Sequence, residues 1–165
     1  MRGRYPQSGP ASRINAVTFE KGTTMSEKIE AREAAPGFLT LHVISDSRGT
    51  TAREVVSSAV VQFSYKRVGI STLARVSTVE QVCCYLDRYV PEPEKTAVFH
   101  TVLDERLRSE IRDELNRRGI ASVDLLGPAM SIVERLIDEE PQNTPGLVVK
   151  REVVNTRMIN AEKLG

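Results

Sequence analysis

The sequence predicts an α/β fold with an open, mainly parallel sheet and helices on both faces. From Phe38 onward, short apolar runs alternate with amphipathic stretches whose apolar residues recur every three or four positions. About four such strand and helix pairs follow one another, and right-handed crossovers would join them into a single parallel sheet. The length of 165 residues fits one domain with its own core.

The first strand and helix are predicted within residues 38–63. The run "FLTLHVI", residues 38–44, is nearly continuous in apolar residues, which is typical of a strand buried on both faces. After a polar corner, Ala52, Val56 and Phe63 belong to one helical stripe.

Two further pairs follow between residues 67 and 119. Residues 67–76 form a weaker strand, and Ser77 or Thr78 is suited to cap the helix that Pro91 ends. Residues 96–102 predict the third strand. Asp104 begins the clearest helix, and Gly119 follows its last turn, at the position where helices commonly end with a glycine in the left-handed conformation.

The fourth pair comprises a strand at residues 120–126 and a helix that follows it. Pro128 takes a first-turn position of this helix. Its apolar stripe is expected to face inward and consists of Ile132, Val133, Leu136 and Ile137.

The two ends of the chain lack this pattern. Residues 1–37 contain scattered prolines, glycines and charges and predict a mobile leader, within which Met25 is a candidate natural start. The α/β domain is expected over residues 38–147. Residues 148–165 form a more polar, divergent tail.

Composition excludes several classes of protein. The net charge is +1 and 40% of residues are hydrophobic, so nucleic acid is not an expected partner. No apolar run approaches the ~18 residues that span a membrane. The two cysteines, Cys83 and Cys84, are adjacent in a helical pattern and point apart, which disfavours a disulfide and favours a cytoplasmic location.

The polar corner after the first strand is a candidate anion site. It consists of Ser45, Asp46, Ser47, Arg48, Gly49, Thr50 and Thr51. Hydroxyls, backbone amides and a helix N-terminus favour an anion, and Arg48 offers a bidentate phosphate contact. The same residue types also make ordinary turns and helix caps, and Asp46 would repel an anion unless it capped the helix or bound a metal. Both interpretations stay open.

Three residues after later strands form a candidate rim of the same site. Ligands of open α/β sheets gather at the carboxyl ends of the strands, where His100, Thr101 and Asp124 are expected. A lone histidine is more often structural than catalytic. No zinc-ligand spacing and no GxSxG motif is present, so we predict no metal and assign no catalytic residue.

Several motifs in order resemble the N-terminal half of the pyruvate, phosphate dikinase regulatory protein family, the bifunctional serine/threonine kinases and pyrophosphorylases. The segments that carry the resemblance, from Leu39 to Leu147, are "HVISDSRGTTAREVVSSAVVQF", "TVEQV", "VFHTVLDERLRSEI", "GIASVDLLGPAMSIVERLI" and "TPGL".

The resemblance implies an activity, cofactors and a partner. It implies a regulator that phosphorylates a threonine of pyruvate, phosphate dikinase with ADP and removes the phosphate with inorganic phosphate, giving pyrophosphate. In that family a GxSRxxKT segment in the C-terminal half holds the nucleotide. Nothing after Gly146 matches this segment, so we expect a chain truncated before the nucleotide-binding loop, with little activity alone.

Two other functions remain open. The first is a non-catalytic module that docks the dikinase or binds a small anion at the Ser45–Thr51 corner. The second is a flavodoxin-like ligand-binding domain. In each case a fold of this length would leave apolar helix faces uncovered, and we expect a dimer or larger homo-oligomer.

Overall fold

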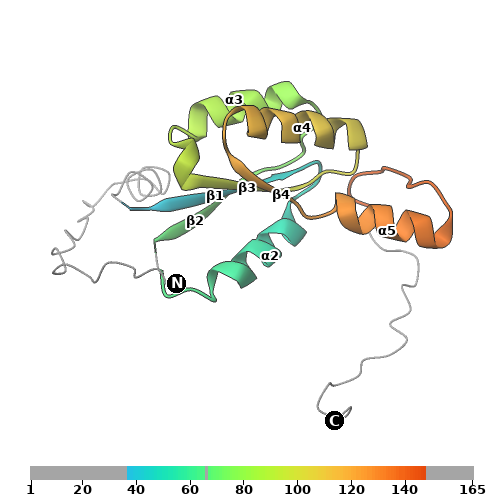
Figure 1. Ribbon diagram of the computed structural model, residues 1–165, viewed down its shortest axis with the longest axis horizontal. Helices are drawn as coiled ribbons and strands as arrows, with labels where there is room; N and C mark the ends of the chain where they lie inside the picture. Colours follow the sequence, from blue (N-terminus) through green and yellow to red (C-terminus); the bar gives the residue numbers. More distant parts are fainter. Residues whose placement is uncertain (1–36, 66, 148–165) are drawn as a thin grey trace, which may run out of the picture. The chain divides into compact units, whose positions relative to one another are not determined.

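The computed structural model describes residues 37–65 and 67–147 and contains a four-stranded, all-parallel sheet (Figure 1). The strands are β1 (Leu39–Ser45), β2 (Val68–Leu73), β3 (Thr96–Thr101) and β4 (Ala121–Asp124). They pair in the order β2-β1-β3-β4. The predicted α/β fold with a parallel sheet is confirmed.

Four helices follow the strands in turn. They are α2 (Thr50–Val60), α3 (Val79–Tyr89), α4 (Glu105–Arg117) and α5 (Gly127–Ile137), and a short 3-10 helix, η1 (Pro93–Lys95), precedes β3. Helices α3 and α4 cover one face of the sheet and α2 lies on the other (Figure 1). Both faces therefore carry helices, as the sequence predicts.

Local sequence explains where the helices begin and end. The Asp104 carboxylate accepts a hydrogen bond from the backbone amide of Leu107 at 2.7 Å and caps α4. Gly119 follows α4 with φ of 70°, the left-handed conformation that glycine adopts without steric cost. At the start of α3, Gln81 Oε1 accepts from the amides of Ser77 at 2.9 Å and Thr78 at 3.3 Å.

The core has one large and one small cluster, separated by the sheet. Fully buried members of the large cluster, under α3 and α4, are Ile44, Val82, Leu86, Val98, Val102, Ile111 and Leu115. The small cluster, under α2, consists of Val43, Ala52 and Val56, with Phe99 and Leu125 packed against it. Successive residues of β1 belong to opposite clusters, Val43 to the small one and Ile44 to the large one, because side chains alternate between the two faces along a strand.

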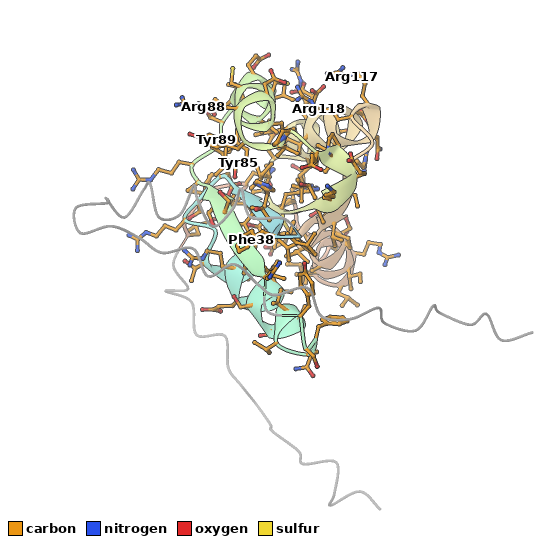
Figure 2. All side chains as sticks on the ribbon, turned by 90° about the vertical axis from the view of Figure 1, so that its left-hand side faces the viewer. Phe38, Tyr85, Arg88, Tyr89, Arg117 and Arg118 are labelled. Carbon is orange, nitrogen blue, oxygen red and sulfur yellow. The ribbon has the colours of Figure 1, made fainter. Side chains whose placement is uncertain are left out.

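An ion network joins α3 to α4 above the large cluster. Glu114 is buried and contacts Arg117 and Arg118, each at 2.5 Å, and Arg118 contacts Asp87 of α3 at 2.5 Å. Figure 2 shows Arg117 and Arg118 at the same end of the view as Tyr85 and Tyr89 of α3. Hydrogen bonding from Arg117 lowers the pKa of Glu114 to about 2, so the carboxylate stays charged at neutral pH.

The expectation that the apolar stripe of α5 faces inward is wrong. Ile132, Val133, Leu136 and Ile137 are between 50% and 79% exposed, and Gly127 is the only buried residue of this helix. Met130, in the second turn, is half-buried, and every residue from Ser131 to Ile137 is exposed. The helical periodicity correctly predicted that these apolar residues share one side of α5. It does not indicate whether the rest of the chain covers that side.

The predicted leader with Met25 and the divergent tail lie outside the described residues, apart from Gly37. Cys83 and Cys84 are both free, as expected.

A buried histidine lies between the sheet and α3. His42 is 1% exposed, and its Nδ1 lies 2.7 Å from the hydroxyl of Tyr85, which donates to Ser71 Oγ at 2.8 Å. Burial lowers the pKa of His42 from 6.5 to about 4. The imidazole is therefore neutral at physiological pH.

We predict that acid weakens the fold through His42. The unfolded chain binds a proton near pH 6.5 and the folded chain near pH 4, so the free energy of unfolding falls between these values. The loss should approach ~2–3 kcal/mol, and burial of His100, whose pKa is also lowered, adds to it. Urea unfolding from pH 7 to 4.5 measures it. Glu114 contributes little in this range, because the stability from its lowered pKa is lost only as the pH falls from 4.5, the pKa of the unfolded chain, toward 2. If the free energy of unfolding of His42→Gln fell with pH as steeply as that of the unmodified chain, His42 would not be the group responsible.

We also predict unequal costs for two glycine substitutions. Gly49 and Gly119 share a φ near +70°, but a Cβ at Gly49 would lie 3.0 Å from Thr72 Cγ2 and 3.1 Å from Val43 Cγ1. A Cβ at Gly119 meets nothing within 4 Å. Gly119→Ala should cost ~1 kcal/mol of stability and Gly49→Ala ~2–4 kcal/mol. Chemical unfolding of both variants at pH 7 measures the difference, and equal losses would show that Val43 and Thr72 move aside freely.

Candidate functional site

The candidate site lies at the carboxyl edge of the sheet, where β1 meets β3. The chain leaves β1 toward β2 on one side, and β3 pairs on the other side of β1. This is the topological switch point of the sheet, where ligands of open α/β folds bind. Ser45, the last residue of β1, is the register partner of Thr101, the last residue of β3.

The corner Ser45–Thr51 is held by backbone hydrogen bonds to the segment after β2. Arg75 donates to the Ser47 carbonyl and Val76 to the Ser45 carbonyl, each at 2.9 Å. Gly49 takes the N-cap position of α2 with φ of 73°, and no side chain caps the helix. The first amides of α2 are thus left without a side-chain acceptor at the positive end of the helix dipole.

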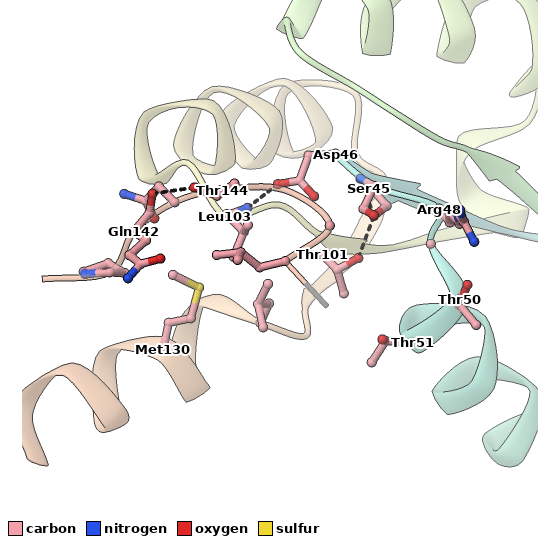
Figure 3. A pocket seen from close by; sticks show the side chains of 17 residues that line it. Ser45, Asp46, Arg48, Thr50, Thr51, Thr101, Leu103, Met130, Gln142 and Thr144 are labelled. Atoms are coloured by element: carbon pink, nitrogen blue, oxygen red, sulfur yellow. Dashed lines mark hydrogen bonds between the residues drawn. The ribbon is translucent and has the colours of Figure 1, made fainter. Parts of the chain in front are cut away.

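A pair of buried hydroxyls forms the floor of the corner. Ser45 Oγ accepts from Thr101 Oγ1 at 3.1 Å and from the amide of Ser47 at 3.1 Å (Figure 3). Each hydroxyl carries one hydrogen, and Thr101 uses its own for this bond. The hydrogen of Ser45 therefore has no acceptor among the described residues.

Asp46 does not cap α2. Its Oδ2 accepts from the backbone amide of Leu103 at 2.7 Å, which ties the first corner to the loop between β3 and α4 (Figure 3). The sequence interpretation weighed a helix cap and a metal as the two uses of this carboxylate. The structure adds a third, which is to join two β-to-α corners.

A pocket of about 660 Å³ opens over this floor. All seven residues from Ser45 to Thr51 line it, together with Thr101 and Leu103. Of the predicted site residues, the whole first corner and Thr101 are therefore brought together. No lysine occurs among the residues that line the pocket.

The opposite wall comes from residues that sequence analysis did not single out. Leu126 and Met130 border the pocket from α5 and the residue before it, and the segment 141–147 closes its far side (Figure 3). Asn143 has a φ of 47°, which is uncommon outside glycine. The sequence "PQNTPG", residues 141–146, is rich in turn-forming residues, and this was the only feature of the sequence that pointed to the segment.

His100 and Asp124 line neither this pocket nor its smaller neighbour. They are register partners on β3 and β4, and His100 Nδ1 lies 3.9 Å from Asp124 Oδ1. His100 is 2% exposed, and its Nδ1 has no hydrogen-bond partner in the described part of the chain. Burial lowers the pKa of His100, against the opposing effect of Asp124.

Asp124 instead organises the start of α5. Its Oδ1 accepts from the amides of Leu126 at 3.0 Å and Gly127 at 2.8 Å, and its Oδ2 lies 3.6 Å from Arg108 Nε. A Cβ on Gly127 would lie 2.2 Å from that Oδ2. This carboxylate therefore has a structural role beside the pocket.

Residues 37–65 and 67–147 carry neither a cluster of metal ligands nor a membrane-spanning helix. This part of the chain contains no group of three or more His, Cys, Asp or Glu residues placed to hold a metal ion. It also contains no helix with the length and apolar character needed to cross a membrane.

Comparison with known proteins gives one consistent match. The family model described as kinase/pyrophosphorylase matches residues 41–162. A pyruvate, phosphate dikinase regulatory protein of Geotalea daltonii is 30% identical over 108 residues, which cover 66% of this chain and 39% of that protein. Its namesake in Halothermothrix orenii is 34% identical over 110 residues, 66% of this chain and 40% of that protein.

A third relative, from Staphylococcus carnosus and of the same name, is 31% identical over 121 residues, 72% of this chain and 44% of that protein. The chain thus spans about two fifths of the length of these curated relatives. The family match covers most of this chain, including every residue of the candidate pocket. The chain belongs to the kinase/pyrophosphorylase family.

Proposed function

We propose that this chain is the N-terminal α/β part of a regulator of pyruvate, phosphate dikinase, and that its Ser45–Thr51 corner binds inorganic phosphate. The observation that carries the proposal is the hydroxyl floor of the pocket. A buried serine whose hydrogen lacks an acceptor is stabilised by a ligand oxygen that accepts it. Phosphate offers several such oxygens.

Donors from three sources converge on this corner. The amides at the start of α2 have no side-chain cap, Ser45 has a free hydroxyl hydrogen, and Arg48 lies exposed at the pocket wall. The nearest carboxylate, Asp46, is engaged by the Leu103 amide, which offsets part of its repulsion of an anion. The arrangement suits a small, multiply charged oxyanion.

The corner suits inorganic phosphate better than ADP. Kinase sites hold a nucleotide through a glycine-rich loop with a lysine that reaches its phosphates, and no lysine lines this pocket. We therefore assign no phosphoryl-transfer step to the described residues. In the proposed regulator, ADP-dependent phosphorylation and phosphate-dependent dephosphorylation of a threonine also need a nucleotide site beyond those residues.

A second candidate function is a non-catalytic module that docks the dikinase. The exposed apolar faces of α5 and of the end of α2 favour it, since such surfaces mark protein contacts. The two functions are separated by incubating the chain with the dikinase and ADP. Phosphate transfer supports an active regulator, and a stable complex without transfer supports docking alone.

We predict that phosphate binding depends on Thr101. Thr101→Val keeps the shape of the side chain but removes the hydroxyl that donates to Ser45 Oγ and so orients the Ser45 hydrogen toward the ligand, and phosphate affinity should fall ~10-fold. Titration with phosphate, followed by amide chemical shifts of residues 45–51, measures this. Thr96→Val is the matched control, because Thr96 lies at the other end of β3.

The same titration tests the proposal itself. In the unmodified chain, phosphate should shift the amides of Thr50 and Thr51 more than chloride does at equal ionic strength. Equal shifts with both salts would show that the corner is only a well-formed turn. Arg48→Gln should weaken phosphate binding while leaving the unfolding free energy nearly unchanged, because Arg48 is exposed.

A further inference from the structure

We propose that the pocket over the Ser45–Thr51 corner binds a small phosphomonoester whose organic group is uncharged and largely apolar. The phosphate lies at the corner, and the organic group lies against Leu103, Leu126 and Met130. This inference rests on the phosphate site proposed above and adds the chemistry of the rest of the ligand.

The pocket is much larger than inorganic phosphate. Its volume is about 660 Å³. A water molecule occupies ~30 Å³, and phosphate is only a few times larger than water. Pockets of roughly 300–1,000 Å³ are typical of sites for organic ligands. Phosphate at the corner therefore leaves most of the pocket for further ligand atoms.

The wall opposite the corner offers apolar contacts. Leu103, Leu126 and Met130 line the pocket and are half-buried. Figure 3 shows Met130 on the side of the pocket opposite Thr50 and Thr51. The thioether of methionine is flexible and polarisable, so it adapts to apolar ligands of different shape. A ligand anchored by its phosphate at the corner thus meets an apolar surface with its other end.

The charges of the pocket are confined to the corner. Asp46 and Arg48 are the only charged residues among those that line it. The far end carries neutral polar side chains such as Gln142 and Thr144 (Figure 3). A second phosphate or a carboxylate there would lose hydration without gaining a cation, which costs free energy. The organic group of the ligand is therefore uncharged.

The adjoining cavity adds to this discrimination. It measures about 300 Å³ and shares Met130 with the first pocket. Its charged lining residues are Glu105, Arg108, Glu134 and Glu140. Three carboxylates against one guanidinium leave a net negative charge beyond Met130. An anionic group that extended past Met130 would be repelled.

The test is titration of the full chain with a series of phosphates, followed by the amide chemical shifts of Thr50 and Thr51. At pH 8 phosphate and its monoesters all carry close to two negative charges, because the second pKa of a phosphomonoester is about 6. Phenyl phosphate should bind at least ~10-fold more tightly than inorganic phosphate, because its ring leaves water for the apolar wall. Methyl phosphate has the ester without the ring and should bind like inorganic phosphate. A phenyl phosphate with a carboxylate on its ring should lose most of the gain.

A substitution in the wall separates it from the corner. Met130→Gln keeps the length of the side chain and an acceptor for Arg108, whose Nη1 lies 3.8 Å from the Met130 sulfur. This variant should bind phenyl phosphate ~5-fold more weakly and inorganic phosphate as before. Ile132→Gln is the matched control, because Ile132 is exposed on the same helix and lines neither pocket.

Failure of this inference can be told from failure of the phosphate site. If phosphate shifts the two amides but phenyl phosphate binds no more tightly than methyl phosphate, the corner stands and the inference is overturned. If no member of the series shifts them more than chloride does, both proposals fail. A capped phosphothreonine represents the other source of a phosphomonoester, a phosphorylated protein. Tighter binding of that compound than of phenyl phosphate would overturn the apolar ligand in favour of a peptide.

Discussion

The pairing of β1 with both β2 and β3 is the constraint on which the rest of this structure depends. It places β1 in the interior of the sheet, which requires apolar side chains on both of its faces, and Val43 and Ile44 supply them in turn. It also brings the end of β1 beside the end of β3. Without that neighbourhood Ser45 and Thr101 would not meet, and the pocket would have no floor.

The fold follows from the sequence because its signals are local and mutually consistent. The apolar run of residues 38–44 needs a two-sided core, and Asp104 and Gly119 mark the two ends of α4 by chemistry that acts within a few residues. The orientation of α5 is different. The stripe beginning at Ile132 has helical periodicity, but what covers a stripe is decided by packing between distant segments, which a single sequence does not show.

The candidate site was predictable in part, for a reason that lies in strand geometry. The edge of the sheet that gathers Ser45, Asp46 and Thr101 follows from parallel topology. His100 and Thr101 are consecutive in β3, so their side chains point to opposite faces, and only Thr101 lines the pocket. This alternation could have been seen in the sequence. The pocket wall formed by residues 141–147 could not have been predicted, because no periodic signal positions an irregular segment.

The hydroxyl contact between Ser45 and Thr101 also bears on how the chain acquires its shape. The two residues are separated by 56 positions, and the loop amide that holds Asp46 lies 57 positions away. Contacts of such long range form late, since their loop-closure entropy must be met before they stabilise anything. On the ribosome, the emerging chain would therefore possess no such binding cavity until β3 had been made and had paired with β1.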